Sequence, residues 1–197
     1  METRLLIASL FVAFGASAAM AQTNTANTVQ RDVNQQTRIE TGLKDGSLNT
    51  KEAGRLETEQ SQVDRLQARD LKDGKLTLKE RAQLRRAQNK ASRDIQSAEH
   101  NNVKGNPESK SSERLQADVQ RNIQQEKRIE QGVQSGALTK PEVSTLERGQ
   151  ARVDRKEAKA ARDGNVGRVE QANIQHADNK HSEEILDKKH NGKTRKG

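Results

Sequence analysis

The feature that most constrains the fold of this chain is an internal repeat with a period of 90 residues. Residues 29–101 align with residues 119–191 without a gap, and 29 of the 73 aligned positions are identical. Self-similarity at a fixed period is typical of a repeated structural unit. We therefore predict two copies of one unit, at residues 28–101 and 113–191. A polar linker rich in Asn, Ser, Gly and Lys joins them at residues 102–112.

Each unit contains a shorter signal twice, and this signal predicts a turn between two helices. It consists of a glycine, an aliphatic residue two positions later, a capping position, and a glutamate three positions after that. Glycine adopts the left-handed conformation that ends a helix, and the capping residue and glutamate can form a capping box on the next helix. The four copies run from Gly46 to Glu52, from Gly74 to Glu80, from Gly136 to Glu142 and from Gly164 to Glu170, the last with Gly167 at the capping position.

Apolar residues recur at spacings of three, four and seven within each unit, which is the period of a buried helix face. Gln60 and Gln150 fall on this face, so we predict a partly polar seam. The pattern predicts an all-α fold of two tandem three-helix units, with no strand. The expected helices lie near residues 28–44, 50–72, 78–100, 114–134, 140–162 and 168–189. The linker permits either docked units or independent bundles.

The composition limits how much core these helices can form. From residue 22 onward, Leu, Ile and Val number 28 in 176 residues, and the net charge is +8. Such a low apolar content with high charge lies towards the disordered end of composition space. We therefore expect a thin core, marginal alone or stabilised by self-association.

The N-terminal residues 1–21 are typical of a signal peptide. A short apolar run from Leu5 to Phe14 is followed by Ala19-Met20-Ala21, which fits the small-x-small cleavage rule. We predict a periplasmic or secreted protein that has no membrane-spanning segment after cleavage. Residues 22–27 are polar and predicted to be disordered, and residues 192–197 form a basic tail.

The turn signal also resembles the second half of an EF-hand calcium loop, with glycine at the sixth position and glutamate at the twelfth. The first and third positions lack the required oxygen ligands, since Arg69 and Lys159 occupy two of the first positions. Capping explains the same residues without a metal ion. The alternative is binding of calcium or another divalent cation by Asp45, Glu52, Asp73, Glu80, Asp163 and Glu170.

The whole unit resembles a type of uncharacterised secreted helical protein of Gram-negative bacteria with degenerate EF-hand-like turns. The shared features are Arg-Ile-Glu-x-Gly at Arg38 and Arg128, the Gly-x-Leu-Thr turns, and a last helix that ends in His-Asn. The resemblance covers nearly all of the chain after residue 21. It implies the fold and the compartment, but no activity or site residues.

The remaining side chains give little sign of catalysis. His100 and His190 lie where a histidine can meet the last carbonyls of a helix, and weak transition-metal binding by the C-terminal histidines, which include His176 and His181, is the alternative. The carboxylates alternate with Lys and Arg, as on solvated helix faces. No nucleophile motif or phosphate loop is present, so we predict no enzyme and no cofactor beyond a divalent cation.

The basic charge leaves several partners open. Acids are spread among the bases and aromatic residues for stacking are absent, so we expect no nucleic-acid binding. An envelope polyanion could contact the tail through Lys188, Lys189, Lys193, Arg195 and Lys196. The leading hypothesis is a non-catalytic protein that binds or scaffolds an unknown protein partner, in envelope stress or matrix organisation. A periplasmic chaperone is one version of it.

Overall fold

The computed structural model describes residues 15–193, with side chains described from residue 24 onward. This range folds into six α-helices and one short 3₁₀ helix, and contains no β-strand, which confirms the all-α prediction. The helices are α1 (Gly15–Asp45), α2 (Thr50–Asp70), α3 (Leu78–Glu99), α4 (Lys110–Gln134), α5 (Lys140–Ala160) and α6 (Arg168–His190), and the 3₁₀ helix η1 (Ala161–Asp163) follows α5.

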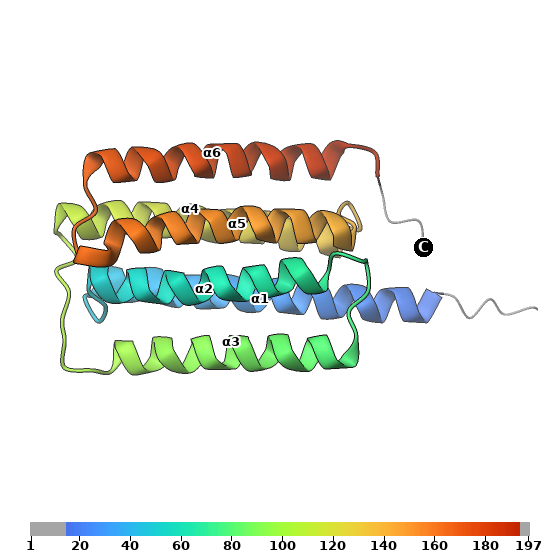
Figure 1. The fold of residues 1–197 in the computed structure, drawn as a ribbon, viewed down its shortest axis with the longest axis horizontal. Helices are drawn as coiled ribbons and strands as arrows, with labels where there is room; N and C mark the ends of the chain where they lie inside the picture. The colour runs from blue at the N-terminus through green and yellow to red at the C-terminus, as the bar shows by residue number, and fades with distance from the viewer. Residues whose placement is uncertain (1–14, 194–197) are drawn as a thin grey trace, which may run out of the picture.

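The helices lie side by side, with α3 on one outer side and α6 on the other (Figure 1). Between these outer helices, α2 packs most extensively against α5, and α1 against α4. The pair α2 and α5 is antiparallel, because Ser61 Oγ donates to the Ala151 carbonyl at 3.0 Å while Ser144 Oγ donates to the Ala68 carbonyl. The two halves of the chain are therefore docked along their length and are not independent bundles.

The turns have the predicted chemistry. Gly46, Gly74, Gly136 and Gly164 all adopt positive φ, between 75° and 89°. After the first turn, the Asn49 side chain accepts from Glu52 N at 2.9 Å, and Glu52 Oε2 accepts from Asn49 N at 3.2 Å. These caps explain why the ends of most helices lie within two residues of the prediction.

Two predicted boundaries differ from the structure, both at helix starts. Residues 22–27, whose polar composition predicts disorder, lie inside α1, where Ala26 is buried beside Ile185 in one apolar cluster. Helix α4 begins at Lys110, inside the predicted linker, because Ser109 provides an N-cap. The predicted leader, residues 1–21, overlaps the start of α1, and its first 14 residues lie outside the described range.

The apolar core is thin and follows the predicted stripe. Its two larger clusters centre on Ile39, Leu56 and Ile95, and on Ile129, Leu146 and Ile185. Several contacts recur 90 residues apart: Asn101 donates to Glu52 at 2.6 Å, and Asn191 to Glu142 at 2.7 Å. That the halves are copies of one unit stays a prediction from the sequence. Among the described residues, no helix is both long and apolar enough to span a membrane.

Candidate metal centre

The residues that the sequence suggests as turn ligands are engaged in local hydrogen bonds. Each of the three aspartates accepts a backbone N–H two residues further on, at 2.8–2.9 Å. Each of the three glutamates accepts the N–H of its capping residue, at 2.8–3.2 Å. The capping interpretation therefore accounts for the whole set: Asp45, Glu52, Asp73, Glu80, Asp163 and Glu170. The structure does not bring them together into a metal-binding group among the described residues.

The histidines do not form a metal-binding group among the described residues either. His100 Nδ1 lies 2.9 Å from the Gln96 carbonyl and His190 Nδ1 lies 2.8 Å from the Leu186 carbonyl, as predicted for helix ends. His176 is exposed. His181 is buried instead, and burial lowers its pKa to about 3, with Arg152 and Arg128 adding to the effect. It is held neutral and lies outside the carboxylate groups described next.

Seven carboxylates lie in the space between the four inner helices, where the sequence pattern predicts none. Each is at most 2% exposed. They project from all four inner helices: Asp32 from α1, Glu57 and Asp64 from α2, Glu126 from α4, and Glu147, Asp154 and Glu157 from α5. The interpretation of the carboxylates as solvated is therefore wrong for these seven, which we call the core carboxylates.

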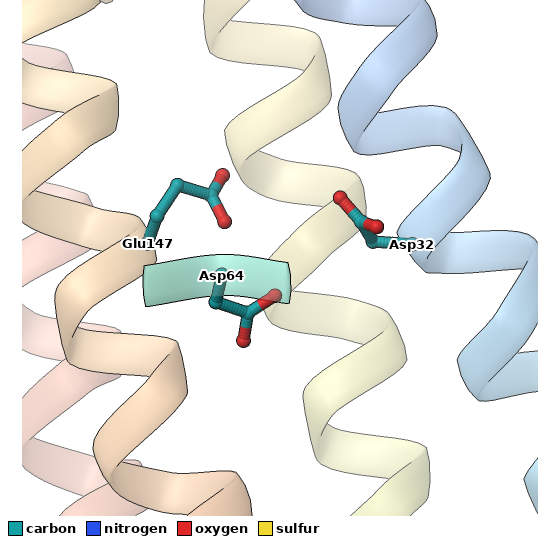
Figure 2. Close-up of side chains that lie close together, drawn as sticks. All are labelled: Asp32, Asp64 and Glu147. Atoms are coloured by element: carbon teal, nitrogen blue, oxygen red, sulfur yellow. The ribbon is translucent and has the colours of Figure 1, made fainter. Parts of the chain in front are cut away.

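One group of core carboxylates joins three helices. Asp32, Asp64 and Glu147 place one oxygen each within 4.8 Å of one another (Figure 2). Asp32 is oriented by two amides, since Gln88 Nε2 donates to Oδ1 at 2.8 Å and Gln67 donates to Oδ2. Both oxygens of Glu147 lack a hydrogen-bond partner. The group therefore combines one fixed carboxylate with unsatisfied ones.

A second group lies between α2 and α5. Glu57, Asp154 and Glu157 also place ligand oxygens within 4.8 Å of one another. Amides orient this group too: Gln36 donates to Glu57 at 3.0 Å, Asn122 to Glu157 at 2.7 Å, and Gln150 to Asp154 at 3.0 Å. The amides leave one oxygen of each carboxylate without a partner.

The two groups are related by the 90-residue offset and interact with each other. Glu57 and Glu147 are equivalent positions, as are Asp64 and Asp154. The Asp154 carboxylate of the second group raises the pKa of Asp64 in the first, so the two groups interact electrostatically. The seven carboxylates thus form one continuous acidic core.

This core lacks compensating positive charge. No Lys or Arg is buried among the residues whose side chains are described. Removing a carboxylate from water costs several kcal/mol unless a proton or a cation neutralises it. Burial accordingly raises the pKa of every core carboxylate, to about 7 for Asp32 and about 6 for Asp154.

A pair of aspartates extends the acidic core towards α6. Asp118 on α4 and Asp178 on α6 are fully buried, and none of their four oxygens has a hydrogen-bond partner. Burial raises the pKa of both to about 7, and the Asp118 carboxylate contributes to the rise at Asp178.

The signal for this site is present in the sequence but easily misread. On α2, residues 57, 60, 64 and 67 are all polar, at spacings of three and four, and residues 147, 150, 154 and 157 repeat the pattern on α5. The polar seam predicted at Gln60 and Gln150 is confirmed, since both are 1% exposed. Extending that seam by one helical turn in each direction would have found Glu57, Asp64 and their equivalents.

The chemistry that this arrangement offers is that of hard-cation coordination. Its ligand atoms are carboxylate and amide oxygens, with no cysteine in the chain and with His181 outside the groups. Oxygen ligands of this kind favour Mg²⁺, Ca²⁺ and Mn²⁺ over softer metals. Comparison with models of protein families, with curated proteins and with solved structures finds no match to this chain.

Proposed function

We propose that the chain is a non-catalytic binding protein that holds hard divalent cations in its core. The observation that carries the proposal is the convergence of two carboxylate triads, each with ligand oxygens within 4.8 Å of one another, in a core without a buried Lys or Arg among the described side chains. Divalent-cation binding is the alternative predicted from the sequence. The proposed ligands are the core carboxylates and not the turn residues.

Unpartnered oxygens favour a cation over protons alone. A protonated carboxyl has an O–H that needs an acceptor and a carbonyl oxygen that needs a donor. Glu126 and Glu147 together have four oxygens without a partner. One divalent cation neutralises two charges and can bind several oxygens at once, so it satisfies more of these atoms than two protons would.

The oxygen donors also narrow the choice of cation. Zn²⁺ and Cu²⁺ sites usually include His or Cys, which these groups lack. Mg²⁺ retains several water ligands, for which a fully buried group has little room. Mn²⁺ and Ca²⁺ are therefore the ions that best suit the core, and Mn²⁺ offers a direct spectroscopic signal.

Cation binding at such a depth would be linked to stability. A ligand that binds only the folded state stabilises it by about 2.7 kcal/mol at 100 times its Kd. The buried position of the carboxylates also means that exchange of the cation requires the helices to separate locally. We therefore expect tight, slowly exchanging binding that raises the melting temperature.

We also propose that the protein acts outside the cytoplasm, and the support for this is the leader-like segment at residues 1–21. Cleavage after Ala21 would shorten α1, but the first buried residue described in α1 is Thr25. The packing of α1 as described is therefore compatible with removal of the leader.

Electron paramagnetic resonance of Mn²⁺ tests the proposal, because the six-line signal of free Mn²⁺ weakens when the ion is bound. The test variant is Asp64→Asn/Glu147→Gln, which neutralises two ligands of the first triad. The matched control is Asp73→Asn/Glu80→Gln, which removes the same charge from a turn. We expect the native chain and the control to bind Mn²⁺ with Kd below about 0.1 mM, and the core variant to bind at least about tenfold more weakly.

Circular dichroism in chelator checks that the core variant is folded, so that a loss of Mn²⁺ binding is not caused by misfolding. The core variant removes charges that lack compensation, so its helical content and melting temperature in chelator should equal or exceed those of the native chain. Absence of Mn²⁺ and Ca²⁺ binding by the native chain at about 1 mM metal, the range of the weakest calcium modules, would refute the proposal. Equal loss of binding in both variants would move the site back to the turns.

A further inference from the structure

A second site-like feature is a surface groove at one end of the bundle. A groove of about 770 Å³ opens between α2, α3 and α5. This volume is within the range of small-molecule sites, about 300–1,000 Å³. Small residues form part of its lining, and they include Gly54, Thr58, Ala98 and Ala158.

Five cationic side chains line the groove. Lys51 and Arg55 are four residues apart on α2, and Arg155 and Lys159 are four apart on α5. The fifth, Arg162, lies in η1. The one acidic lining residue, Glu52, is already engaged with the N–H of Asn49 and the amide of Asn101. The groove therefore carries a strong excess of positive charge.

These cations make no ion pair within the described part of the chain, and the Asp94 carboxylate, which interacts electrostatically with Arg55, is paired with Lys90. Among the described residues, none of the five takes part in an ion pair or a side-chain hydrogen bond, although all five are exposed. The equivalents of Arg155 and Lys159, 90 residues earlier, are engaged: Arg65 donates to the Ser61 carbonyl at 2.9 Å, and Arg69 pairs with Asp70 at 2.8 Å. Holding like charges together without partners is unfavourable unless an anion joins them.

Helix packing holds the cations at the groove. Because α2 and α5 are antiparallel, the start of α2, which carries Lys51 and Arg55, lies beside the end of α5, which carries Arg155 and Lys159. A Cβ at Gly54 would lie 2.5 Å from Ala161 Cβ, so glycine is what allows η1, with Arg162, to approach α2 this closely. At the equivalent position 144 the chain has serine.

We propose that this groove binds an anion that carries two or more phosphate groups. Arg and Lys are the side chains that bind phosphate oxygens most effectively, and Arg does so through paired N–H donors. Five cations in an open groove can bind several phosphate charges at once. A ligand with a single carboxylate carries only one negative charge and would leave most of the cations without a partner. The phosphates could belong to a free oligophosphate or to a lipid headgroup, since both present the same chemistry.

This inference relocates the polyanion site predicted from the sequence. Lys188 and Lys189 lie at the end of α6, and Lys193 follows it, at the opposite end of the bundle from the groove (Figure 1). Arg195 and Lys196 lie outside the described residues. The groove gathers its cations from three separate segments, α2, α5 and η1, so a sequence search for a continuous basic run does not find it.

Calorimetric titration with sodium tripolyphosphate, in metal-free buffer at about 0.1 M salt, tests the groove. The test variant is Arg55→Gln/Arg155→Gln/Lys159→Gln. The matched control, Lys79→Gln/Lys127→Gln/Lys180→Gln, removes three exposed cations from outside the groove. We expect at least about a tenfold loss of affinity in the test variant and less than about a threefold change in the control.

Sedimentation with phosphatidylcholine vesicles, with and without cardiolipin, identifies the source of the phosphates. Cardiolipin-dependent binding that the test variant loses and the control keeps supports the groove and assigns it to a headgroup. Tripolyphosphate binding without vesicle binding supports the groove and assigns it to a free oligophosphate. An equal loss in both variants, or no binding of either probe by the native chain, would overturn the proposal.

Discussion

At the scale of single residues, His181 differs from its equivalent in the other half of the repeat, where the side chain is much smaller. Its ring is 3% exposed and neither ring nitrogen has a partner. The ring fits because Gly149 faces it on α5: a Cβ on that glycine would lie 2.3 Å from His181 Nδ1. In the other half, the equivalent positions hold Ala91 and Glu59. The large and small side chains are therefore exchanged together.

This complementarity predicts strong coupling between the two residues. Gly149→Ala should lower the free energy of unfolding by about 1–3 kcal/mol, because the new methyl group overlaps the ring. In a His181→Ala background the same change should be neutral or stabilising by up to about 1 kcal/mol, since alanine favours a helix over glycine. Urea denaturation of the four proteins measures the coupling, and additive effects would contradict it.

At the scale of helices, each element begins and ends where local chemistry requires it. Helix α2 begins after Asn49, whose side chain caps Glu52 N, and the turn before it needs the left-handed Gly46. Capping signals can be read in a sequence because cap and helix lie within four residues of each other. This is why the helices near 50–72, 78–100 and 140–162 were predictable.

The caps predict a loss of stability that is separate from metal binding. Asn49→Ala should lower the free energy of unfolding by about 1 kcal/mol, because an N–H at the start of α2 loses its acceptor. Lys51→Ala, in the same turn but without a capping bond, should change it by less than about 0.5 kcal/mol. Thermal melts in chelator measure both. A loss of Mn²⁺ binding in Asn49→Ala would show instead that the turn is part of the metal site.

The acidic core could not be predicted in the same way, because it depends on contacts between distant helices. In the sequence, Arg55 lies two residues before Glu57 and Arg65 directly follows Asp64, so both acids have a neighbouring opposite charge, as on an ordinary solvated helix. What makes them buried is the packing of α2 against α5, which the sequence does not specify by itself. The start of α1 was missed for the same reason, since Ala26 is held by an apolar cluster that includes residues of α4, α5 and α6.

At the scale of the whole molecule, a group of carboxylates is buried in the core, whereas no described Lys or Arg side chain is buried. The net charge of +8 counts all seven core carboxylates as ionised. Protons or cations bound in the core leave an exterior more basic than the composition suggests. The interior and the surface thus have opposite polarity, which supports two kinds of ligand: cations inside the bundle and anions in the outer groove.

Metal-free protein should lose stability as the pH rises. Burial raises the pKa of Asp32 from 3.8 to about 7 and that of Asp154 to about 6, so the folded state binds these protons more tightly than the unfolded state does. The stability that they contribute is complete below pH 4 and is lost as the pH rises through 6 and 7. His181 acts in the opposite sense between pH 6.5 and 3, because its pKa is lowered, but it is one group against several. We expect a melting temperature in chelator at least about 5 °C higher at pH 5 than at pH 8.

The cation should reverse this dependence, because it competes with protons for the same oxygens. At pH 8 the core carboxylates are free to bind metal, so Mn²⁺ should raise the melting temperature by about 5–10 °C, and at pH 5 by much less. The variant Asp64→Asn/Glu147→Gln should show a weaker dependence on both pH and metal, since two of the titrating ligands are gone. Circular-dichroism melts at pH 5 and pH 8, each with chelator and with Mn²⁺, measure all four conditions. A native chain that is more stable at pH 8 in chelator would show that its buried carboxylates are compensated without protons or metal, and the acidic core would then have no need of a cation.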